Sequence, residues 1–204
     1  MNIKDVATPS YIVDEGKLKS NLEILKSVID RTGCRILLAQ KCFSMYAVYP
    51  LIGQYISGCT ASGLFEARLG ITIEKLEEEL GENPRFLEGV DGFHFHTLCE
   101  QNSDDLETTL EAVEQKFGKY LYDMKWLNMG GGHHITRKDY DVERLVRLVN
   151  HMKEKYQVQV YLEPGEAVAL NAGYLKTTVL DIVENAGSST HTASHPTPVL
   201  QVIS

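Results

Sequence analysis

The chain has 204 residues, enough for one sizeable domain with a hydrophobic core or for two small ones. Apolar residues make up 43% and charged residues 24%, which is the balance of an ordinary globular protein. The net charge of −8, without a basic stripe, argues against a nucleic-acid-binding protein. No apolar run approaches the roughly 18 residues of a transmembrane helix, so the sequence predicts no interaction with a membrane.

The first fifteen residues contain acidic side chains where a secretory signal peptide has a basic and then an apolar stretch. The four cysteines form no CxxC pair and no zinc-ribbon spacing, so they are expected to be reduced thiols. Both features predict a cytoplasmic protein. An acidic surface would suit a cationic substrate such as a polyamine, although mild acidity also simply favours solubility.

Short apolar runs alternate with helical patterns in the first half of the chain. A strand-like run at 10–13 precedes a helix in which leucine and isoleucine recur at helical spacing as far as Gly33. The apolar run at 35–39 is typical of a buried strand. A helical stretch follows within 45–56, and a second short strand is expected at 58–62.

The second half repeats this order. The patterns predict helices at 71–80, 104–117 and 141–155, strands at 90–96, 120–129 and 158–162, and an extended segment at 173–184. Strands that alternate with helices predict a parallel sheet, either doubly wound or closed as a β/α barrel. Residues 185–204 are rich in Ser, Thr, His and Pro and are expected to form a disordered tail.

Chemically unusual residues stand just after the predicted strands, and this placement favours the barrel. In a β/α barrel the C-terminal ends of all strands converge on one face, where the active site lies. Five features share the placement: Lys41, Ser62, His96, the Gly130–Gly132 run and Glu163.

Lys41 ends an otherwise apolar strand. Burial there would lower the pKa of its ammonium group, and a neutral amine is a nucleophile toward aldehydes. The alternative is an ordinary lysine that reaches solvent from the strand end. Taken alone the residue favours the alternative, and its neighbouring motifs favour the nucleophile.

Two further motifs would suit a phosphorylated pyridine cofactor. The backbone N–H groups of Gly130, Gly131 and Gly132 could cradle a phosphate, although three glycines can also be a flexible turn. The carboxylate of Glu163 could hold the proton on a pyridine nitrogen, or it could be a surface glutamate at a turn.

His94 and His96 alternate on a predicted strand and so point to the same face. Such a pair can bind zinc, with His133, His134 or Glu163 as further ligands. Alternatively, one imidazole stacks on a flat cofactor and the other contacts the substrate. No clear additional ligand stands at another strand end, so the sequence predicts a cofactor site and no metal.

These motifs lie within six distinctive segments. They are TPSYIVDE at 8–15, ILLAQKCFSMYAVYPLI at 36–52, TASGLFEARLG at 60–70, GFHFHTLCEQ at 92–101, LNMGGGHHITRKDYD at 127–141 and LEPGEAVAL at 162–170. On these strings the chain resembles the alanine-racemase-like, or type III, family of pyridoxal-phosphate-dependent decarboxylases. The resemblance implies a (β/α)8 barrel followed by a β-rich domain, pyridoxal 5'-phosphate as the cofactor, and a homodimer.

The resemblance also implies a role for each matching residue. Lys41 would attach the cofactor, His96 would stack on its ring, and Glu163 would pair with the ring nitrogen. The Gly130–Gly132 run would bind the phosphate. An arginine often follows Glu-Pro-Gly in the wider family, whereas Glu166 stands here, which favours the branch that decarboxylates small cationic carboxylated polyamines. Glu166 and His94 would then contact the substrate.

The sequence departs from the family in the middle and at the end. Arg68-Leu-Gly70 continues directly into Ile71-Thr72, as though two similar strings had been joined, so about two βα units are expected to be missing. We therefore expect residues 1–184 to form an incomplete (β/α)8 barrel that binds the cofactor. The C-terminal β-domain is expected to be largely absent, and 185–204 not to belong to the family.

Three other functions stay open from the residues alone. The first is a diaminopimelate decarboxylase or an amino-acid racemase of the same fold. The second is a zinc-dependent barrel hydrolase that uses His94 and His96. The third is a remnant that has lost catalysis.

Overall fold

A computed structural model describes residues 3–60, 71–179, 183–185, 188–190 and 197–203. It divides into two compact units, one made of residues 21–168 and the other of residues 1–20 with 169–204. The predicted features Ser62 and Arg68 lie outside the described residues. No helix of the described residues is long and apolar enough to cross a membrane.

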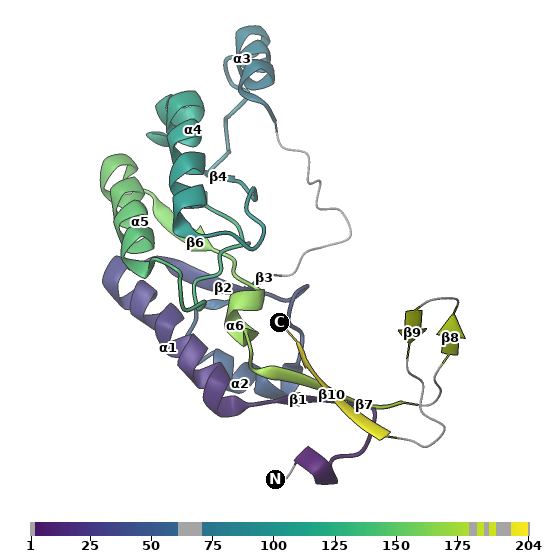
Figure 1. Ribbon diagram of the computed structural model, residues 1–204. Helices are drawn as coiled ribbons and strands as arrows, with labels where there is room; N and C mark the ends of the chain where they lie inside the picture. Colours follow the sequence, from purple (N-terminus) through teal and green to yellow (C-terminus); the bar gives the residue numbers. More distant parts are fainter. Residues whose placement is uncertain (1–2, 61–70, 180–182, 186–187, 191–196, 204) are drawn as a thin grey trace. The chain divides into compact units, whose positions relative to one another are not determined.

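The larger unit contains a sheet of five parallel strands (Figure 1). Its strands are β2 (Arg35–Ala39), β3 (Gly58–Thr60), β4 (Gly92–His94), β5 (Trp126–Asn128) and β6 (Gln159–Leu162). Their order in the sheet is β3-β2-β6-β5-β4, so β6, the last of these five strands in the chain, pairs with β2, the first of them. This is the order around a barrel that is opened between β3 and β4, and it confirms the predicted incomplete β/α barrel.

The opening falls where the sequence departs from the family, because residues 61–70 connect β3 to the segment that leads to β4. A complete barrel has eight strands, three more than the structure describes in this sheet. The sequence predicted a gap of about two units.

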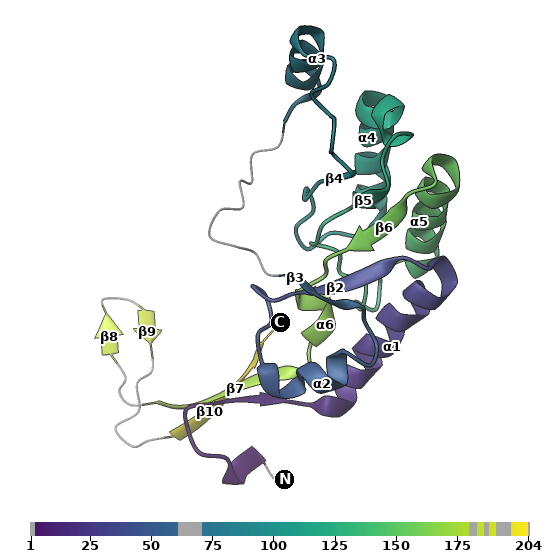
Figure 2. The same ribbon diagram turned by 180° about the vertical axis from the view of Figure 1, so that it is seen from behind.

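Helices cover one face of the sheet. Figures 1 and 2 show α1 (Glu15–Thr32), α4 (Ser103–Leu121) and α5 (Val142–Tyr156) along this face. The strand residues that point toward them are fully buried, among them Ile36, Leu127 and Val160. The Asp141 side chain accepts from the Arg144 N–H and caps α5, close to where the sequence predicted the helix to begin.

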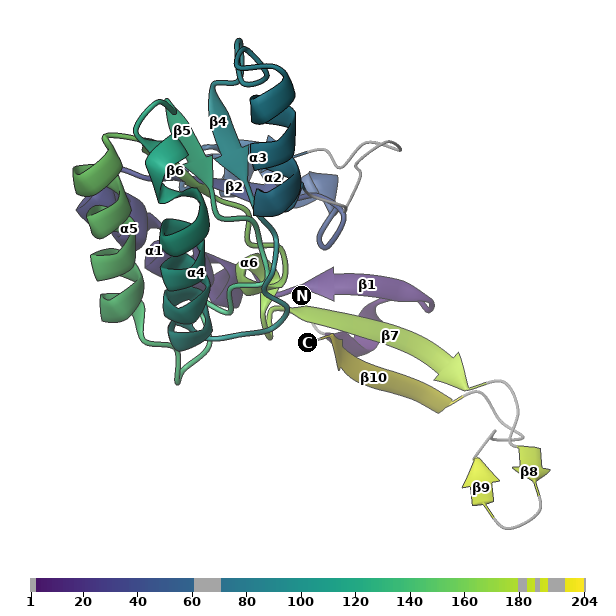
Figure 3. The same cartoon turned by 90° about the horizontal axis from the view of Figure 1, so that it is seen from above.

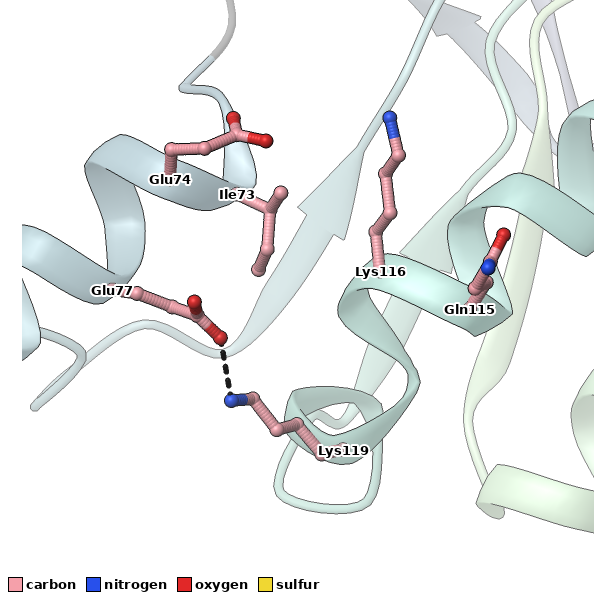
Figure 4. Close-up of a pocket in the computed structure, with 6 residues that line it drawn as sticks. All are labelled: Ile73, Glu74, Glu77, Gln115, Lys116 and Lys119. Carbon is pink, nitrogen blue, oxygen red and sulfur yellow. Dashed lines mark hydrogen bonds and ion pairs between the residues drawn. The ribbon is translucent and has the colours of Figure 1, made fainter.

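The larger unit also contains three short helices and a 3-10 turn. They are α2 (Tyr49–Ile52), α3 (Ile73–Glu82), α6 (Glu166–Ala169) and η2 (Tyr46–Val48). A hollow between α3 and α4 is lined by Ile73, Glu74, Glu77, Gln115, Lys116 and Lys119 (Figure 4). Lys119 and Glu77 form an ion pair there at 2.7 Å, and none of the predicted site residues lines this hollow.

The opposite, inner face of the sheet is only partly covered. Trp126 and Tyr161 are half-buried and meet edge to face, with the exposed Arg35 guanidinium over the Tyr161 ring. Gly92 leaves room for Trp126, because a Cβ at position 92 would overlap the indole. A closed barrel buries such side chains completely in its interior.

The smaller unit is an antiparallel sheet with the order β1-β7-β10 (Figure 3). It consists of β1 (Ser10–Val13), β7 (Gly173–Val179) and β10 (Thr197–Ile203). β8 (Val183–Asn185) and β9 (Ser188–Thr190) form a separate antiparallel pair. A 3-10 turn, η1 (Ile3–Asp5), precedes β1. The extended conformation predicted for 173–184 is present in β7.

Residues 185–204 were expected to lack regular structure, whereas β10 pairs with β7 over seven residues. The segment TPVLQVI is rich in β-branched and apolar residues that favour strands, and this preference outweighs its proline. Pro198 is tolerated because β10 lies at the edge of the sheet. The assignment of 1–184 and 185–204 as separate regions stays a prediction.

Candidate functional site

The predicted site residues lie at one edge of the five-stranded sheet. Lys41 follows β2, His94 ends β4 with His96 two residues later, and Glu163 follows β6. One polar atom from each of His94, His96 and Glu163 lies within 4.8 Å of the others. The parallel strands bring these side chains together, because all their carboxyl ends meet at the same edge.

Asn128, at the end of β5, forms hydrogen bonds with both Glu163 and the glycine run. Its Nδ2 group donates to Glu163 Oε1 at 2.8 Å, and its Oδ1 accepts from the Gly130 N–H at 2.9 Å. The sequence analysis missed this residue. No sequence pattern marks it, because its place opposite His94 is seen only once the strands are paired.

The ring of His96 is fixed by the glycine run. The Gly131 N–H donates to His96 Nδ1 at 3.1 Å, so the proton of the neutral imidazole is on Nε2. A metal-bound histidine has the opposite arrangement, in which one nitrogen binds the metal and the other donates. This arrangement does not suit His96 as a zinc ligand, and the choice between a cofactor site and a metal site stays a prediction.

The glycine run needs glycine because its backbone has positive φ angles and lies very close to other backbone atoms. Gly130 and Gly132 have φ of 69° and 80°, a region that favours glycine. A Cβ on Gly131 would lie 2.5 Å from the Glu163 carbonyl oxygen. Gly130 and Gly131 already donate to Asn128 and His96, so they would have to exchange these acceptors to bind a phosphate. The predicted phosphate role stays a prediction.

Lys41 is exposed, so the burial that the sequence analysis considered for its amine is not observed. Its segment nevertheless lies against the Glu163 turn. The Ala39 N–H donates to the Pro164 carbonyl at 3.3 Å, and a Cβ on Gly165 would overlap Cys42. The backbone that carries Lys41 therefore contacts the turn that follows Glu163, and its exposed amine is open to an incoming aldehyde.

Glu166 is oriented by a histidine of the loop that follows the glycine run. Its Oε2 lies 3.2 Å from Nε2 of the buried His134. The neighbouring His133 is also buried and donates from Nε2 to the Met129 carbonyl at 3.3 Å. Of the further zinc ligands that the sequence analysis considered, Glu163 lies with His94 and His96, whereas His133 and His134 are not part of this group.

Burial also sets the charge of His133. Loss of hydration lowers its pKa to about 4, so the imidazole is neutral near neutral pH. Its Nδ1, like that of His134, has no hydrogen-bond partner among the described residues.

No protein-family profile matches the chain. A carboxynorspermidine/carboxyspermidine decarboxylase from Campylobacter jejuni is 36% identical over 255 residues, which cover 91% of this chain and 67% of the relative. The chain belongs to the carboxynorspermidine/carboxyspermidine decarboxylase family. A second member, from Herminiimonas arsenicoxydans, is 25% identical over 87% of this chain and 68% of its own length.

Solved structures agree with this family and its fold. A crystal structure of carboxynorspermidine decarboxylase complexed with norspermidine, from Campylobacter jejuni, has a TM-score of 0.75 and 35% identity, covering 89% of this chain and 66% of that one. A lysine/ornithine decarboxylase from Vibrio vulnificus shares the fold at 12% identity, with a TM-score of 0.62.

The chain spans about two thirds of the length of these decarboxylases. The matched region of the Campylobacter jejuni enzyme is 255 residues long, more than the 204 residues of this chain. Family members therefore contain residues inside the match that have no counterpart here, as the opening between β3 and β4 leads one to expect.

Proposed function

We propose that this chain is a pyridoxal-phosphate-dependent decarboxylase that converts carboxynorspermidine or carboxyspermidine into norspermidine or spermidine. The observation that carries the proposal is its 36% identity to a decarboxylase of that name, together with the cluster at the strand ends. The norspermidine complex of a structural relative supports a polyamine product.

The chemistry of the site suits pyridoxal 5'-phosphate. A primary amine, an imidazole and a carboxylate lie at one edge of the sheet, and these are the groups that attach, cover and protonate a pyridine aldehyde. When bound, the cofactor supplies an electron sink that accepts the pair left by the departing carboxylate. The role of Gly130, Gly131 and Gly132 in holding its phosphate is part of this proposal.

Each residue then has a defined task. Lys41 would hold the cofactor through its amine. Glu163, held by Asn128, keeps the proton on the ring nitrogen. His96 would cover the ring, from the position that the Gly131 N–H gives it in the chain without cofactor.

Two side chains, His94 and Glu166, would contact the substrate. His94 is exposed next to His96 and Glu163 and would meet the reacting end of the substrate. The Glu166 carboxylate would attract an ammonium group of the polyamine, and His134 holds it in place. We also propose that the chain forms a homodimer in the cytoplasm. Light scattering of the purified chain tests whether the dimer forms.

A spectral titration tests the cofactor assignment. Added pyridoxal phosphate should produce the visible absorbance of a lysine adduct, and borohydride should fix it to the chain. Lys41→Ala should abolish fixation, with Lys4→Ala as the control that keeps it. An adduct that survives Lys41→Ala would overturn the role of Lys41.

Release of carbon dioxide tests the reaction. Carboxynorspermidine or carboxyspermidine should release it, and diaminopimelate should be the poorer substrate. Faster release from diaminopimelate would contradict the substrate assignment.

The partly covered inner face of the sheet favours a second candidate, a chain that binds the cofactor without decarboxylation. Visible absorbance of the lysine adduct, with no carbon dioxide released from either substrate, would support this second candidate.

A further inference from the structure

The amide of Asn128 connects two strands of the site. Its nitrogen donates to Glu163 and its oxygen accepts from Gly130, at 2.8 Å and 2.9 Å. Only one orientation of the amide serves both bonds, because a carboxylate can only accept and a backbone N–H can only donate. The two bonds together fix the Asn128 side chain and the Glu163 carboxylate.

The sheet places Asn128 between the other groups of the site. β5 lies between β4 and β6, and Asn128 is opposite His94 on one side and Tyr161 on the other. Glu163 stands two residues beyond Tyr161 and therefore shares its face. Asn128 is half-buried, which strengthens its hydrogen bonds relative to those of an exposed amide.

We propose that Asn128 is a positioning residue that holds the Glu163 carboxylate for the ring nitrogen of the cofactor. The identity of the cofactor rests on the proposed function, whereas the bond between Asn128 and Glu163 belongs to the chain alone. An amide is needed here, because an aspartate would face Glu163 with a second carboxylate and could not donate while ionised.

The first test measures the Tm of the chain without cofactor. Near pH 7, Asn128→Asp should lower the Tm by about 5 °C, because two carboxylates then meet at hydrogen-bond distance. The loss should shrink near pH 5, where one proton can be shared between them. Asn150→Asp, on helix α5, is the matched control and should leave the Tm nearly unchanged.

A double variant tests the contact directly. In Asn128→Asp with Glu163→Gln the bond is reversed, because the new glutamine amide donates to the new aspartate, which still accepts from Gly130. The Tm should return to within about 2 °C of the parent chain at both pH values. His94, His96 and Lys41 also carry ionisable groups at this edge, and the same groups are present in every variant.

The second test measures affinity for pyridoxal phosphate from the visible absorbance. Asn128→Asp and the double variant should both bind at least about tenfold more weakly, since neither presents a well-placed carboxylate at position 163. The double variant also lacks the Glu163 carboxylate, so Asn128→Asp alone decides the role of Asn128. A purely structural role would give Asn128→Asp, measured near pH 7 and well below its Tm, the affinity of the parent chain.

Three results would overturn the proposal. A double variant no more stable than Asn128→Asp would disprove the contact. Unchanged affinity in Asn128→Asp would disprove the positioning role. If the parent chain itself produced no absorbance, the proposed function and the positioning role would fail together, while the Tm series would still decide whether the bond exists.

Discussion

The buried imidazole of His133 makes the stability of the fold depend on pH. It is 1% exposed and closes the turn by donating to the Met129 carbonyl. Burial lowers its pKa from the ordinary value of 6.5 to about 4, and the neighbouring His96 adds to the effect. Protonation is therefore much harder in the folded chain than in the unfolded one.

We expect His133 to destabilise the fold in acid. The folded chain binds fewer protons than the unfolded chain when the pKa is lowered, so stability is full above pH 6.5 and falls as the pH drops toward 4. The loss from this group approaches about 3 kcal/mol at the lower end. The free energy of unfolding, measured with urea at several pH values in this range, should change less with pH in His133→Gln than in the parent chain.

The exposed His151 on α5 provides the control. His151→Gln removes an exposed imidazole that pairs with Glu114, and it should change the dependence of stability on pH less than His133→Gln does. Equal slopes for His133→Gln and the parent chain would show that the buried imidazole does not titrate as expected.

At the level of elements, Lys176 ties the N-terminal turn to β7. This lysine is 5% exposed, and its ammonium group donates to the carbonyls of Ile3, Lys4 and Val6. A buried ammonium group is tolerated only when its donors are satisfied. The three carbonyls accept one hydrogen bond from each of the three protons of the Lys176 ammonium group.

Lys176→Met should therefore destabilise the smaller unit. The methionine fills a similar volume but leaves three carbonyls without their donor, at a cost of about 2 kcal/mol. Calorimetry should show a Tm lower by about 5 °C. Lys19→Met removes only an exposed, 4.0 Å ion pair with Glu15 and should leave the Tm unchanged. Equal Tm values for the two variants would contradict the role of Lys176.

At the scale of the whole molecule, the sequence predicted the alternation of strands and helices because periodicity is local. Lys41, His96 and Glu163 could be placed at strand ends for the same reason. The pairing of β6 with β2 depends on residues more than 120 positions apart, and no local pattern encodes it. Asn128 was missed because an amide carries no chemical signature until its partners are known.

Trp126 reports on that opening, because it is the single tryptophan of the chain and is half-buried on the inner face. A closed barrel would surround the indole with side chains. We expect acrylamide to quench its fluorescence to an extent between that of the guanidinium-unfolded chain and that of a fully buried tryptophan. The quenching should not change with protein concentration if the face is open in a single chain. Quenching that disappears at higher concentration would instead show that a second copy covers the inner face, and it would place the dimer contact on the sheet.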